Sequence, residues 1–230
     1  ADQPAAAETD DSLDAFIARR AADLTAYQNA AYAKRYTDLI GRIGDTESEK
    51  TPGRTDLTEV AAKALYKLMA YKDEYEVARL YTDGRFEAKL RDQFDAGAKL
   101  RFHLAPPLLA ERDPGTGRLR KTEYGPWVFT AFRLLAGLKG LRGTAFDIFG
   151  RSEERRAERR LIAEYITTLE TLMTGLSDAN HEIATDIARL PMSIRGFGHV
   201  KEANMATAVS RHESLMETFK NGGAEKTAAE

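Results

Sequence analysis

Cysteine is absent from the 230 residues of this chain. The chain therefore forms no disulfide and offers neither a thiolate nucleophile nor a thiolate metal ligand. Because protein-bound iron–sulfur clusters are held mainly by Cys, we expect no such cluster in this chain on its own. Histidine is scarce, and its four residues show no HExxH-type spacing, so the sequence predicts no zinc site.

Long apolar runs are missing as well. No stretch approaches the roughly 18 consecutive apolar residues of a membrane-spanning helix, so we expect no membrane partner and a cytoplasmic location. The first residues, Ala1 to Pro4, lack the basic and apolar regions of a signal peptide. Residues 1–11 have the composition of an interdomain linker, which favours a domain that belongs to a longer polypeptide.

The familiar catalytic signatures are also lacking. The sequence contains no GxxxxGK[ST] loop, no GxGxxG fingerprint and no Gly-x-Ser-x-Gly elbow. An independent enzyme that uses His103 or His199 as acid or base is disfavoured, because no convergent acid/base cluster accompanies either residue. We therefore predict no catalytic residue, no bound cofactor and no metal site in this chain.

What is present is the composition of a folded protein. Hydrophobic residues make up 43% and charged residues 30%, which is enough apolar material for a core. The net charge of −2 conceals an asymmetry, since residues 99–160 contain 14 Lys and Arg against 7 Asp and Glu, a net of +7. This basic middle favours an anionic partner, or else a solvated surface with internal ion pairs. Nucleic acid is not expected, because the chain as a whole is slightly acidic and has no recognised binding signature.

Apolar spacing predicts a mainly α, multi-helix fold, with a single domain over residues 12–220. A long first helix is expected over 12–43, and a helical C-terminal third over 152–220. The middle, 99–150, reads as irregular because a double proline interrupts helical spacing there, and short runs around a turn favour one small β-hairpin. Residues 221–230 read as a frayed tail.

An arginine stripe is the first candidate binding site. Arg151, Arg155 and Arg159 recur at helical spacing, and guanidinium forks suit phosphate or carboxylate groups. Interleaved glutamates offer the alternative, in which much of this charge is paired internally.

A glycine-rich corner is the second candidate. Arg195, His199 and Lys201 surround the predicted start of the last helix, where exposed amides suit an anion. Phe197 and His103 are candidates to line a pocket. The alternatives are a sharp helix–helix corner with Phe197 in the core, and a hydrogen-bonded core histidine at 103.

Four segments together carry a family resemblance. They are Tyr71 to Phe86, Phe102-His103-Leu104-Ala105-Pro106-Pro107-Leu108-Leu109, Tyr124-Gly125-Pro126-Trp127, and Ile194 to Asn204. In this order they resemble the C-terminal domain of the large, fused indolepyruvate ferredoxin oxidoreductases of proteobacteria. The resemblance extends from the helical segment at residue 17 to about residue 219.

The resemblance implies a parent enzyme that decarboxylates an aryl pyruvate on thiamine diphosphate with Mg²⁺, passes electrons through iron–sulfur clusters to ferredoxin, and yields an acyl-CoA. In that family these sites lie in domains N-terminal to this one, so no catalytic residue is assigned here. The implied role is an accessory domain that packs on the catalytic domains of the same polypeptide or docks ferredoxin or CoA. A stand-alone helical interaction module without catalysis is the alternative.

Overall fold

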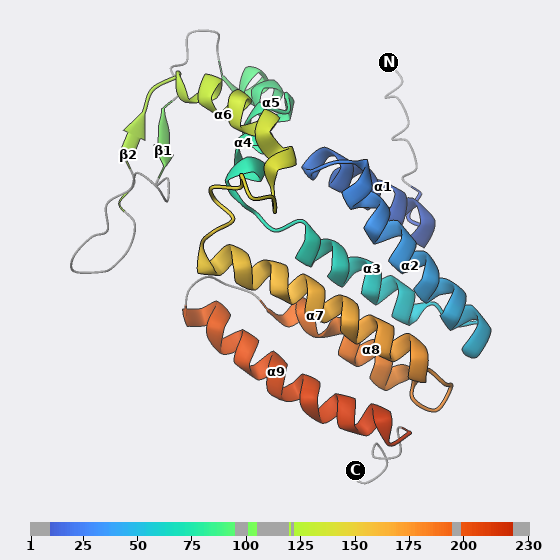
Figure 1. The fold of residues 1–230 in the computed structure, drawn as a ribbon. Helices are drawn as coiled ribbons and strands as arrows, with labels where there is room; N and C mark the ends of the chain where they lie inside the picture. Colours follow the sequence, from blue (N-terminus) through green and yellow to red (C-terminus); the bar gives the residue numbers. More distant parts are fainter. Residues whose placement is uncertain (1–9, 95–100, 105–119, 121, 195–198, 223–230) are drawn as a thin grey trace, which may run out of the picture. The chain divides into compact units, whose positions relative to one another are not determined.

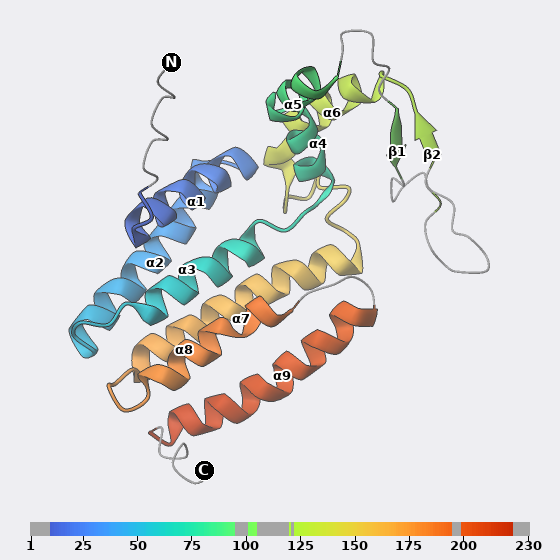
Figure 2. The same cartoon turned by 180° about the vertical axis from the view of Figure 1, so that it is seen from behind.

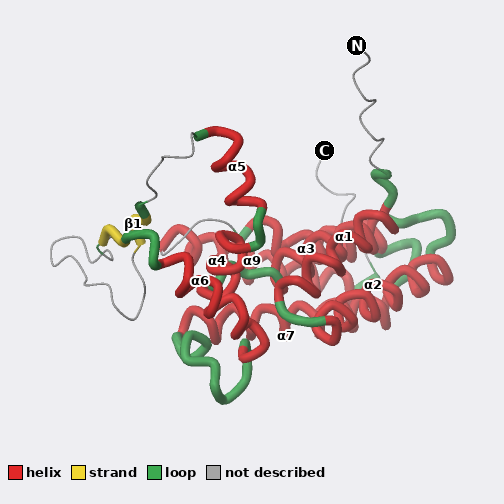
Figure 3. The backbone as a smooth tube through the Cα atoms, turned by 90° about the horizontal axis from the view of Figure 1, so that it is seen from above, coloured by secondary structure: helices red, strands yellow, loops and turns green. Residues whose placement is uncertain are grey.

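The computed structural model describes residues 10–94, 101–104, 120, 122–194 and 199–222, with the backbone alone for 199–203. Helices dominate the described chain, and one pair of short strands accompanies them (Figure 3). The mainly α prediction is confirmed. Whereas the sequence predicted one domain over 12–220, the chain divides into two compact units: unit 1 comprises Ala1–Tyr71 and Ser152–Glu230, and unit 2 comprises Lys72–Arg151.

Unit 1 is a layered array of helices from both ends of the chain (Figures 1 and 2). Its elements are α1 (Leu13–Tyr27), α2 (Ala30–Lys50), α3 (Asp56–Met69), α7 (Glu153–Gly175), α8 (His181–Arg189), the 3-10 helix η2 (Leu190–Ser193) and α9 (His199–Lys220). Helix α1 packs on α2, α2 on α3, α3 on both α7 and α8, and α8 on α9.

The core of unit 1 lies where α2, α3, α7 and α8 meet. Small residues on the facing sides of α3 and α8, among them Ala61 and Ala184, are fully buried and leave room for the two helices to approach. Large aliphatic side chains fill the space between, and burying each stabilises the fold by about 1.5–3 kcal/mol relative to exposure. The largest of them are Leu24, Ile40, Ile43, Leu57, Leu65, Leu169, Leu172 and Ile187.

The predicted single helix over residues 12–43 is corrected by the structure. Helix α1 ends at Tyr27 and α2 begins at Ala30, because Asn29 adopts an extended backbone and its side chain accepts the N–H of Tyr32 at 2.8 Å. Asn is among the best residues for starting a helix in this way. Helix α2 then continues past Ile43 to Lys50, and the chain turns afterwards at Gly53, whose φ of 85° suits glycine.

A buried carboxylate joins three helices of unit 1. Glu47 of α2 is 1% exposed and accepts the backbone N–H groups of Leu57 and Thr58, both at 2.9 Å, at the start of α3. The Thr58 hydroxyl donates to it at 2.5 Å, and His181 Nε2 of α8 lies 2.6 Å away. Burial alone raises the pKa of Glu47, but the hydrogen bonds from Thr58, His181 and Leu57 outweigh it and hold the pKa below its ordinary value.

Unit 2 has its own small aromatic core. Its elements are α4 (Glu74–Thr82), α5 (Arg85–Gln93), strands β1 (Phe102–Leu104) and β2 (Thr122–Tyr124), α6 (Val128–Gly137) and the 3-10 helix η1 (Leu138–Leu141). The strands pair antiparallel, with Phe102 opposite Tyr124, so the predicted small hairpin pairing is present. The rings of Tyr81, Phe102 and Phe132 pack together at centroid distances of 5.4–6.0 Å.

A buried ion pair anchors α4 within unit 2. Arg142 Nε and Nη2 lie 2.5 and 2.8 Å from the two carboxylate oxygens of Asp73, and both side chains are buried. Asp73 also caps α4, because its side chain accepts the backbone N–H of Glu76 at 2.8 Å. Nearby, Asp147 accepts the N–H groups of Gly143 and Gly150, each at 2.8 Å. Burial and the adjacent Asp147 carboxylate raise the pKa of Tyr75 to about 12.

We predict that Glu47→Gln lowers the free energy of unfolding at pH 7 by about 2 kcal/mol, because a buried charged acceptor is lost. The pH dependence has a definite sign. A lowered carboxyl pKa in the folded state contributes stability at neutral pH that is lost as the pH falls below about 4.3. Urea unfolding at pH 7 and pH 3.5 therefore shows a smaller difference for Glu47→Gln than for the native chain. Glu49→Gln, an exposed change on the same helix, is the matched control, and equal behaviour of the two variants contradicts this account.

We predict that Arg142→Met and Asp73→Asn each destabilise unit 2 by about 3–5 kcal/mol, because each leaves one buried charge unpaired. The double variant recovers a large part of this loss, since neither charge then remains. This double-mutant cycle is measured by urea unfolding, with the fluorescence of Trp127 as the signal. Trp127 is the sole tryptophan and a residue of unit 2. Arg133→Met, which breaks the exposed pair with Glu87, is the control and costs under about 1 kcal/mol. Additive effects of the two buried changes contradict the pairing.

Candidate functional site

The predicted arginine stripe is not a single helical face. Helix α7 begins at Glu153, so Arg151 precedes it and belongs to unit 2, where its Nη2 donates to the carbonyl of Ala145 at 3.1 Å. Arg155 is partly buried, pairs with Glu158 at 2.8 Å and lies over the ring of Tyr71. Arg159 is also partly buried. The interleaved glutamates therefore take up part of this charge.

The remaining predicted residues are placed as follows. His103 is exposed on β1 opposite Glu123, because strand alternation turns its neighbour Phe102 inward. His199 and Lys201 belong to the first turn of α9, but their side chains lie outside the described part of the structure. Arg195 and Phe197 lie outside the described residues altogether. The structure therefore brings none of these candidates together in the part that it describes.

An exposed apolar stripe on α6 and η1 is the first feature that the sequence reasoning missed. The inner face of α6, with Val128 and Phe132, packs in unit 2. The opposite side is apolar too: Trp127, Ala131, Leu134 and Leu138 recur at i, i+4, i+7 and i+11 and are all exposed. We call these four residues the α6 stripe. Its spacing is visible in the sequence, but a stripe of this kind normally indicates a core face.

The exposure of this stripe is large for such side chains. Trp127 is 61% exposed, Leu134 70% and Leu138 43%. Unit 2 exposes two further large apolar side chains in the segment that follows, Phe146 at 76% and Ile148 at 57%. Single exposed apolar residues are ordinary, but a cluster in one small unit is typical of a surface that another protein covers.

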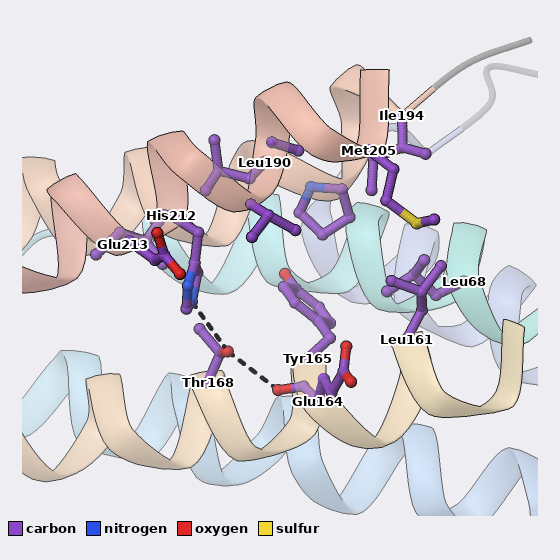
Figure 4. A pocket seen from close by; sticks show the side chains of 14 residues that line it. Leu68, Leu161, Glu164, Tyr165, Thr168, Leu190, Ile194, Met205, His212 and Glu213 are labelled. Carbon is purple, nitrogen blue, oxygen red and sulfur yellow. Dashed lines mark hydrogen bonds between the residues drawn. The ribbon is translucent and has the colours of Figure 1, made fainter. Parts of the chain in front are cut away.

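A pocket of about 300 Å³ in unit 1 is the second missed feature (Figure 4). It lies between α7 and α9, and residues of α3, α8 and η2 also line it. Residues of α7 and α9 line it at spacings of three and four, so each helix presents one face to it. The apolar lining consists of Leu68, Leu161, Tyr165, Ile187, Leu190, Pro191, Ile194, Met205, Ala208 and Val209.

The polar groups of this pocket are few. His212 Nε2 of α9 lies 3.3 Å from Thr168 Oγ1 of α7, and the Thr168 hydroxyl donates to the carbonyl of Glu164 at 3.0 Å (Figure 4). Because that hydroxyl has a single proton, its bond to His212 is one in which the imidazole donates. Burial lowers the pKa of His212 despite the opposing charges of Glu213 and Glu164, so the ring is neutral at pH 7.

The described residues show neither a metal cluster nor a membrane helix. No group of three or more His, Asp or Glu side chains among them is arranged to hold a metal ion. None of the described helices combines the length and the apolar character that crossing a membrane requires. The prediction that the chain binds no cofactor or metal remains a prediction.

Comparison with known proteins places the chain in a family without assigning a role. No curated protein and no solved structure matches it. The sequence profile of a family described as "Family of unknown function (DUF6537)" matches residues 13–214, which is most of the chain and takes in both units. The chain therefore belongs to the DUF6537 family.

Proposed function

We propose that this chain is a non-catalytic helical accessory domain of a cytoplasmic 2-oxoacid:ferredoxin oxidoreductase, and that it packs on the catalytic domains of the same parent. In this proposal thiamine diphosphate, Mg²⁺ and the iron–sulfur clusters belong to those other domains. The resemblance of four sequence segments to the C-terminal domain of the indolepyruvate enzymes supports the parent. The exposed α6 stripe is the observation that supports packing as the role.

The α6 stripe suits a protein partner better than a small ligand. Its side chains stand on the convex outside of a helix, where a flat or grooved protein surface can cover them. Trp and Leu anchors that become buried on association contribute most to the energy of such interfaces. The exposed cations beside the stripe are partly neutralised, since Arg133 pairs with Glu87, so apolar contact rather than charge dominates this face.

Four buried titratable groups support the non-catalytic part of the proposal. Glu47 caps α3 and holds His181, while Asp73 caps α4 and holds Arg142. Each of these groups is already engaged in a contact that serves packing. Docking of ferredoxin or CoA through the basic middle is a weaker version of the role, because part of that charge is paired internally.

We predict that the chain, co-expressed with the catalytic domains of the parent as a separate polypeptide, co-purifies with them. The double change Leu134→Glu and Leu138→Glu weakens that association at least tenfold, because two carboxylates would have to be desolvated at the interface. Binding is measured by biolayer interferometry on the purified components, and circular dichroism verifies the fold of each variant.

Arg133→Gln, an exposed change on the same helix outside the stripe, is the matched control and leaves the affinity within about twofold. If the native chain does not bind the catalytic domains, the proposed parent enzyme is wrong. If the double variant binds as tightly as the native chain, the α6 stripe is not the interface. Oxidation of an aryl pyruvate by the purified chain alone contradicts the non-catalytic role.

A further inference from the structure

The pocket between α7 and α9 has properties that the packing role does not use. It lies wholly in unit 1, whereas the α6 stripe lies in unit 2. Its volume of about 300 Å³ is at the lower end of the range for small-molecule sites, which suits a single ring with a short side chain.

The walls of the pocket favour an apolar group of a ligand. Leu161 and Tyr165 of α7 line the cavity opposite Met205 of α9 (Figure 4). Ala208 and Val209 of α9 also belong to the apolar lining. The Tyr165 hydroxyl already donates its proton to the carbonyl of Ala188 at 2.8 Å, so it does not donate a hydrogen bond to a ligand in the pocket. Methionine and aromatic side chains adapt well to flat rings, and Met205 offers a polarisable sulfur to such a ring.

The rim of the pocket selects for positive charge. Glu164 and Glu213 line it from opposite helices, and both are exposed acidic side chains. Its lining among the described residues includes no Lys or Arg. An anionic ligand such as a carboxylate or a phosphate would meet two acidic side chains there, with no compensating cation among the described lining residues.

The geometry points to a binding site for a small primary amine that carries an apolar ring. We infer that the ring occupies the cavity between Leu161 and Met205, while the ammonium group reaches the carboxylates of Glu164 and Glu213. His212 is fixed by Thr168 at one side of the cavity and adds a polar contact without adding charge. The inference is independent of the proposed packing role, and its failure leaves that role untouched.

Three probes of matched size separate the contributions of shape and charge. They are 2-phenylethylamine, which is cationic, 2-phenylethanol, which is neutral, and 3-phenylpropionate, which is anionic. Titration of each into the full 230-residue chain is followed by the methyl NMR signals of its methionines. The chain has five Met, and Met205→Leu identifies the signal of the pocket residue.

We expect the amine to shift the Met205 signal saturably, the alcohol to bind about two- to fivefold more weakly, and the propionate at least tenfold more weakly. Replacing both carboxylates, Glu164→Gln and Glu213→Gln, brings the amine to the affinity of the alcohol. Glu217→Gln, an exposed change further along α9 that does not line the pocket, leaves all three affinities unchanged.

Ala208→Phe, which fills the cavity, abolishes the Met205 shift for every probe, and circular dichroism and the remaining methyl signals verify that the chain is folded. The inference is overturned if the three probes bind equally, or if the propionate binds most tightly. It is also overturned if the amine leaves the Met205 signal unmoved, or if Glu217→Gln weakens the amine as much as the pocket changes do.

Discussion

The Glu47 carboxylate is the constraint on which the arrangement of unit 1 depends. Two chain segments build this unit, and unit 2 interrupts them between residues 72 and 151. Glu47 contacts the start of α3 and, across 134 residues of sequence, His181 of α8. A carboxylate removed from water requires several donors at once, so α2, α3 and α8 must meet in one geometry for it to be satisfied. The pocket and α9 are positioned by helices that this contact fixes.

Lysines reinforce the same joint between the two segments. Lys50 Nζ donates to the carbonyls of Met173 and Thr174 near the end of α7, at 2.8 and 3.0 Å. Lys67 Nζ reaches the carbonyls of Pro191 and Ile194 at 2.8 and 2.9 Å. Carbonyls at helix ends have no partner within the helix, and a cation there is favourable both as a donor and for the helix dipole. Unit 1 is therefore closed by polar contacts at its helix ends and by apolar packing between them.

Unit 2 differs from unit 1 in which side chains it buries and which it exposes. It buries the charged pair of Asp73 and Arg142 yet exposes Trp127, Leu134 and Phe146. A buried ion pair adds little net stability over an apolar replacement, but it penalises every arrangement that separates the two charges. The ion pair therefore favours a single arrangement of unit 2, and the packing role proposed above uses the apolar side chains that this unit exposes.

The sequence predicted the helical class, the helices of the C-terminal third and the small hairpin, because periodicity and turn residues act locally. It missed the helix starts at Asn29 and Asp73, since an Asn or Asp within apolar spacing has the same appearance whether it caps a helix or lies on its surface. No local pattern marks Glu47 as buried, because its partners are distant in sequence. The α6 stripe had a visible spacing, but only the structure shows that nothing in the described chain covers Leu134.

Hydrogen–deuterium exchange of the chain, alone and with the catalytic domains of the proposed parent, tests the central claim most directly. The account predicts that amides of residues 127–141, which comprise α6 and η1, exchange more slowly in the complex, while those of α7 are unchanged. Protection confined to unit 1, or no protection anywhere in the chain, contradicts it.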